Sequence, residues 1–79
     1  MAWLITHTLD AFNLEHVLKI YADKSKVKGQ LTSGFAINVA VDFAPEVAQR
    51  IVRDIIELLS YGHSVEVVGE DVRPISTLR

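Results

Sequence analysis

The 79-residue chain contains no cysteine, which excludes a disulfide framework, a thiolate metal site and a cysteine nucleophile. Its four glycines never approach the G-x-G-x-x-G or P-loop spacing that binds nucleotide phosphates. No apolar run reaches the ~18–20 residues of a membrane span. The first residues, MAWLITHTLD, lack the basic region and the length of a signal peptide. We therefore expect a cytoplasmic protein without a membrane-spanning segment.

Charged residues are few and nearly balanced in sign. Eight Lys and Arg residues against ten Asp and Glu residues give a net charge of −2, so no global field attracts nucleic acid or anionic membranes. Apolar residues make up 49% of the chain and charged residues 23%, which argues against disorder. The length predicts a single domain over residues 1–79, with little interior for so many apolar side chains. Association of two chains often relieves such a surplus.

The strongest pattern in the chain runs from Pro45 to Ser60 and reads PEVAQRIVRDIIELLS. At ~100° per residue, its apolar side chains fill one half of a helical wheel and its polar side chains fill the other. This arc of roughly 180° is wider than the ~100° stripe that a surface helix needs. Asp42 or Ala44 would begin the helix, Pro45 suits its first turn, and Gly62 suits a left-handed C-terminal cap. The pattern predicts one long amphipathic helix whose broad apolar face must be covered.

Alternating and β-branched stretches on both sides of this helix predict strands. They cover residues 2–8, 27–31, 35–43, 64–68 and 72–75, and the turns between them are 23–25, 33–34 and 69–71. Within residues 35–43, we expect the odd-numbered apolar side chains to pack on the helix. Ala36, Asn38 and Ala40 would form the opposite face, which meets solvent or another chain. Pro74 restricts the last strand to the edge of a sheet.

The segment Phe12–Asp23 fits two interpretations. As a helix over residues 10–23, it would give a ferredoxin-like β-α-β-β-α-β sandwich. As a strand that follows a tight turn at Leu14–His16, it would give an α+β protein with an antiparallel sheet of four or five strands packed against one helix. Periodicity alone does not decide between them in so short a segment, and we favour the strand.

Two groups of residues support the strand by resemblance. Phe12–Val17 with Ile20-Tyr21, and later Gly34–Val39 with Glu46–Ala48, resemble a pattern in many small bacterial and phage proteins of unknown function. In those proteins a short hairpin, an N-L-acidic-x-V turn and two more strands precede a C-terminal helix. The resemblance covers residues 3–59 and carries no active-site residues, so it implies a fold and no activity.

No arrangement of residues predicts catalysis, a cofactor or a metal. His7, His16 and His63 fall in three separate predicted elements, and none forms an i,i+3 or i,i+4 pair with another His or with a carboxylate in a way that suggests metal ligation. Ser60 and His63 are close in sequence, but they flank a helix end and no nucleophile motif surrounds them. We therefore predict that the protein is not an enzyme and holds no cofactor or metal.

Two surface features carry hypotheses about function. The apolar arc of the helix is wider than a single sheet can cover, so a second chain would cover the remainder. This predicts a homodimer, with an interface at Trp3, Val52, Ile56 and Tyr61. A lysine-rich edge would instead bind nucleic acid or phosphate, although lysines on exposed strands also prevent aggregation; its residues are Lys19, Lys24, Lys26 and Lys28. A non-enzymatic module that self-associates is the first hypothesis, and a nucleic-acid-binding accessory protein is the alternative. No small-molecule ligand can be inferred.

Overall fold

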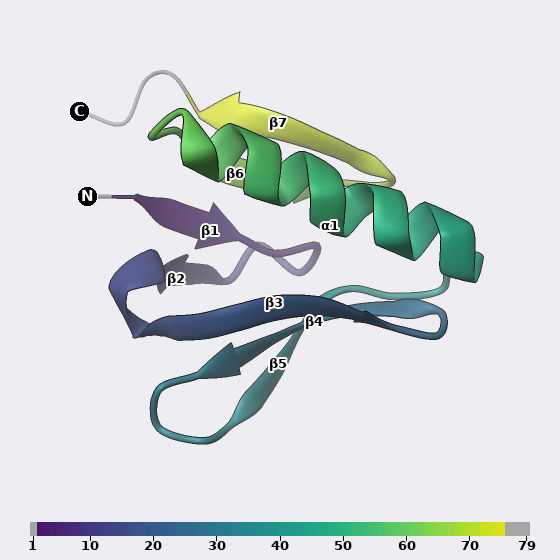
Figure 1. Ribbon diagram of the computed structural model, residues 1–79, viewed down its shortest axis with the longest axis horizontal. Coiled ribbons are helices and arrows are strands. Elements are labelled where there is room, and N and C mark those ends of the chain that lie inside the picture. The colour runs from purple at the N-terminus through teal and green to yellow at the C-terminus, as the bar shows by residue number, and fades with distance from the viewer. Residues whose placement is uncertain (1, 76–79) are drawn as a thin grey trace.

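A computed structural model describes residues 2–75 of the chain. Within them, seven strands in two sheets accompany one long helix, which makes the fold α+β (Figure 1). The strands are β1 (Trp3–Ile5), β2 (Ala11–Asn13), β3 (Val17–Asp23), β4 (Lys26–Leu31), β5 (Ala36–Ala40), β6 (Ser64–Val68) and β7 (Asp71–Ile75). A 3-10 turn, η1 (Leu14–His16), joins β2 to β3, and the helix α1 (Pro45–Ser60) joins β5 to β6.

The strands divide into a four-stranded sheet of order β2-β1-β6-β7 and a three-stranded sheet of order β3-β4-β5. Strand β1 runs parallel to β6, and the other pairs are antiparallel. The α+β class and the single long helix are confirmed, but the strands form two sheets where one sheet of four or five strands was expected. Residues 6–10 form a tight turn, in which the Thr6 N–H bonds to the Asp10 carbonyl at 2.9 Å and Leu9 adopts a φ of 66°. This tight turn ends β1 after Ile5, so the strand expected over residues 2–8 is shorter.

Residues 11–23 form a strand, a 3-10 turn and a second strand. The Asn13 side chain accepts a hydrogen bond from the Glu15 N–H at 3.0 Å, and the Val17 N–H bonds to the Leu14 carbonyl. Asparagine favours such turns because its side chain bonds to the backbone two residues later. The ferredoxin-like alternative is therefore wrong, and the predicted turn at Leu14–His16 is confirmed.

The helix α1 has the bounds that its sequence pattern predicts. Ala44 precedes it in extended conformation without a side-chain cap, and Pro45 occupies the first turn. At the C-terminal end Gly62 adopts a φ of 82°, and its N–H bonds to the Leu59 carbonyl while the His63 N–H bonds to the Leu58 carbonyl. These two bonds form a Schellman motif, which ends the helix. Neither α1 nor any other helical segment within residues 2–75 is long and apolar enough to cross a membrane.

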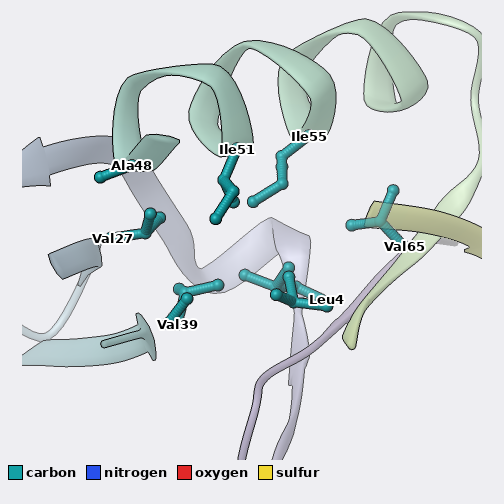
Figure 2. Close-up of a cluster of buried hydrophobic side chains, with 9 residues drawn as sticks. Leu4, Val27, Val39, Ala48, Ile51, Ile55 and Val65 are labelled. Carbon is teal, nitrogen blue, oxygen red and sulfur yellow. The ribbon is translucent and has the colours of Figure 1, made fainter. Parts of the chain in front are cut away.

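The core lies where α1 meets both sheets. Figure 2 shows Ile51 and Ile55 of α1 above side chains that come from the two sheets. The buried apolar residues are Leu4, Val65 and Val67 from the four-stranded sheet, Val27, Val39 and Ala40 from the three-stranded sheet, and Ala48, Ile51 and Ile55 from α1. Strands of both sheets contact α1, so most of its broad apolar arc is covered within one chain.

Strand β5 departs from the simple alternation that its sequence suggests. Its pairing with β4 steps from Val27–Ala40 to Lys28–Asn38 and leaves Val39 as an extra residue, a β-bulge. Val39 and Ala40 are consequently both buried, while Ala36 and Asn38 are exposed. The expectation of one uniform small face is thus wrong for Ala40. Phe35 precedes the strand and is 74% exposed, so it does not pack on the helix as expected.

Candidate interaction surfaces

An apolar groove of about 370 Å³ lies between the C-terminal half of α1 and the start of β3. Aliphatic side chains from both elements, from η1 and from the segment before β1 form its walls. The lining residues are Ala2, Leu14, Val17, Leu18, Lys19, Ile20, Ile56 and Leu59. We call this surface the apolar groove. It can bury a complementary apolar surface, and Lys19 is the one charged residue among those that line it.

Two large aliphatic side chains of the apolar groove are exposed to solvent. Leu18 is 66% exposed and Ile56 is 54% exposed. Leu18 lies between the pairs Val17–Leu31 and Lys19–Gln30 and has no partner of its own in β4, so it is the extra residue of a β-bulge. Bulges re-aim side chains, and here the bulge residue joins Val17, Lys19 and Ile20 of the same strand in lining the groove. Neighbouring exposed aliphatic groups of this kind mark interaction surfaces more often than single ones do.

The four residues predicted for an interface are not gathered at one place. Of the four, only Ile56 is among the described residues that line the apolar groove. Val52 is partly buried against the core, and Tyr61 is 71% exposed just beyond the end of α1. Trp3 is partly buried, and its backbone N–H donates to Ser64 Oγ at 2.9 Å, which joins the start of β1 to β6. The sequence did not predict Leu18 as an interface residue, because the alternation of apolar and polar residues around it does not predict a bulge.

The lysines occupy one hairpin. Lys19 lies in β3, Lys24 in the turn, and Lys26 and Lys28 in β4, and these are all the lysines of the chain. Of the ten carboxylate side chains, only Asp23 lies on this hairpin, at 3.4 Å from Lys28 Nζ. Because β4 is the central strand of its sheet, the lysines cover a face of the sheet and not just an edge.

Strand pairing identifies which side chains share that face. Tyr21 lies opposite Lys28, Lys19 lies opposite Gln30, and Lys28 lies opposite Asn38 on its other side. Alternate residues such as Ile20, Ala22 and Val27 point to the other face and join the core. We call the outer surface the basic face; its members are Lys19, Tyr21, Asp23, Lys26, Lys28, Gln30, Ala36 and Asn38, and Asp23 is its one carboxylate. On it, Lys19 Nζ lies 4.9 Å from the centroid of the Tyr21 ring, within the range of a cation–π contact.

A second, more polar groove of about 460 Å³ lies between the β1–β2 turn and β5. Its lining residues are His7, Thr8, Asp10, Phe12, Ile37, Asn38 and Val41. Thr8 Oγ1 donates to Asp10 Oδ2 at 2.8 Å, a bond that closes the turn. Across residues 2–75, no three His, Asp or Glu side chains gather as a metal site would require. His16 and His63 lie on other elements, so the three histidines do not converge here.

Comparison of the chain with protein-family models, curated proteins and solved structures found no match. The resemblance to small bacterial and phage proteins therefore stays a prediction.

Proposed function

We propose that this protein is a non-enzymatic interaction module that self-associates as a homodimer through the apolar groove. The observation that carries the proposal is the joint exposure of Leu18 and Ile56 at the mouth of a groove with aliphatic walls. A two-fold dimer presents the same patch twice, so each apolar contact made by one chain is made again by the other. The cytoplasmic location expected from the sequence belongs to this proposal.

The size of the gain follows from the exposed fractions. Full burial of a Leu or Ile side chain contributes about 1.5–3 kcal/mol, and roughly half of that remains available at side chains that are 66% and 54% exposed. Four such side chains in a dimer give roughly 3–6 kcal/mol. Association itself costs about 4–15 kcal/mol, so the walls of the groove, including Leu14 and Leu59, must add to the gain. We therefore expect a dimer that dissociates on dilution.

Native mass spectrometry across a protein concentration series tests this proposal. Ile56→Glu and Leu18→Glu each place a carboxylate in the groove, and we expect both to give folded monomers at concentrations where the unsubstituted protein is a dimer. Phe35→Glu is the matched control, because Phe35 is an apolar side chain with 74% exposure that does not line the groove. We expect this control to remain a dimer.

Two results would contradict the proposal. A monomer at every concentration would show that the apolar groove does not mediate self-association. A dimer that survives both Ile56→Glu and Leu18→Glu would place the interface elsewhere. Circular dichroism of each variant separates loss of assembly from loss of fold, since α1 supplies 16 helical residues to the signal.

A further inference from the structure

The charges of this protein are segregated on its surface. Its four lysines lie on the β3–β4 hairpin, and nine of its ten carboxylates lie outside it. Asp54 and Glu57, for example, line a shallow hollow between α1 and β7. A chain with a net charge of −2 therefore presents a basic face to an approaching polyanion. Exposed charges separated by more than about 10 Å are screened at ordinary salt, so the local cluster decides which ligands are attracted.

The basic face also carries an aromatic ring and two amide side chains, groups that can stack on a base or hydrogen-bond to it. The Tyr21 ring is partly buried and has Lys19 Nζ at 4.9 Å from its centroid. A base has a flat π-face and can stack on the ring in place of this ammonium group, which is then free to contact a phosphate. Gln30 and Asn38 share the face, and their amides both donate and accept hydrogen bonds. Positive charge beside an aromatic ring is the arrangement by which sheets bind single strands.

From these contacts we propose that the basic face binds single-stranded nucleic acid. Apart from Leu18, which lies beside Lys19 at the bulge and lines the apolar groove, the side chains on it include no aliphatic group larger than Ala36 among the described residues of β3, β4 and β5. An anionic membrane is a poorer partner, because membrane-binding surfaces add apolar side chains that insert between lipids. A duplex is also poorer, since its bases are already stacked and cannot cover Tyr21. The basic face shares Lys19 with the apolar groove but does not include Ile56, so Ile56→Glu tests self-association without changing the basic face.

Fluorescence anisotropy with a labelled 12-nucleotide oligothymidylate tests the proposal. We expect binding at ~50 mM salt that weakens about 20-fold at ~200 mM if three lysines contact phosphates. Lys26→Gln with Lys28→Gln, at two lysines that do not line the apolar groove, should lower the steepness of this salt dependence by about 1.4. Arg53→Gln with Arg73→Gln removes the same charge from α1 and β7, outside the basic face, and should leave that steepness unchanged.

The tyrosine ring supplies a second and independent readout. Tyr21→Ala should weaken binding at least about fivefold, because a stacked base is lost. Tyr21→Phe keeps the ring and should bind like the unsubstituted protein. Ile56→Glu should also bind, which separates this proposal from the proposed dimer.

Three outcomes would overturn the inference. The first is no binding at ~50 mM salt. The second is equal binding by Tyr21→Ala and by Tyr21→Phe, together with equal competition from a 12-base-pair duplex, which would reduce the basic face to an unselective cationic surface. The third is binding to vesicles that contain anionic lipid while the oligonucleotide does not bind, which would make a membrane the partner.

Discussion

Two neighbouring isoleucines of α1 give a quantitative test of the structure. Ile55 is fully buried and Ile56 is 54% exposed. Substitution of either by Ala removes three carbons, which at ~0.8 kcal/mol per buried group is about 2.4 kcal/mol of transfer free energy for a buried site. A cavity contribution adds to this at Ile55, so we expect Ile55→Ala to lower the free energy of unfolding by about 3–4 kcal/mol. Ile56→Ala should lower that of the monomer by about 1 kcal/mol, because half of the side chain is already in water.

Urea unfolding followed by the fluorescence of Trp3, the one tryptophan of the chain, measures both effects. With a slope of about 1 kcal/mol per molar urea, the midpoints should fall by about 3 M for Ile55→Ala and by about 1 M for Ile56→Ala. Where Ile55→Ala is too unstable to measure, Ile55→Val and Ile56→Val keep the comparison, with an expected loss of about 0.5–1.5 kcal/mol for the buried site.

Repeating this experiment at several protein concentrations tests whether Ile56 lies in a dimer interface. If Ile56 lies in a dimer interface, the stability of the unsubstituted protein rises with concentration and the loss in Ile56→Ala grows with it. The loss in Ile55→Ala should not. Equal losses for the two variants at the lowest concentration would refute the reasoning, because they would mean that Ile56 is buried within one chain and that the apolar groove is not open.

Two further predictions concern the ends of elements. Gly62→Ala should lower the free energy of unfolding by about 1–2 kcal/mol in thermal or urea unfolding, because Gly62 has a φ of 82° that alanine adopts only with strain. No atom lies within 4 Å of an added Cβ, so the loss should come from the backbone and not from a clash. Gly62→Asn should cost less, and equal costs for the two variants would contradict a purely backbone origin. Ser64→Ala should lower the free energy of unfolding by about 1–2 kcal/mol, because the Trp3 N–H loses the Ser64 Oγ acceptor at 2.9 Å. The rate of hydrogen exchange at the Trp3 amide should rise in this variant. An unchanged exchange rate would show that the bond contributes nothing to stability.

Much of the fold could be predicted from local patterns. The bounds of α1 follow from its apolar arc, from Pro45 at its start and from Gly62 beyond its end. The strand β6 and the edge position of β7 follow from a β-branched run and from Pro74 in the same way. These signals depend on residues within a few positions of one another, so a single sequence contains them in full.

The candidate surfaces were only partly predictable. The lysines are visible as a cluster in the sequence, but their common face with Tyr21 and Asn38 depends on the pairing of β4 with strands on both of its sides. Ile56 was predicted from its place on the helix, whereas Leu18 was not. Leu18 is the extra residue of a bulge, and a bulge shifts the alternation of inward and outward side chains without any change in composition.

The sequence by itself determined the class of the fold, the place of the long helix and the order of most strands along the chain, because periodicity and turn chemistry are local. Only the tertiary structure decided the division into two sheets, the parallel pairing of β1 with β6, and the bulges at Leu18 and Val39. Those features depend on contacts between distant segments, such as the bond from the Trp3 N–H to Ser64, which spans 61 residues. The helix face is broader than one sheet can cover, and the two sheets together enclose it except at Ile56 and its neighbours in the apolar groove.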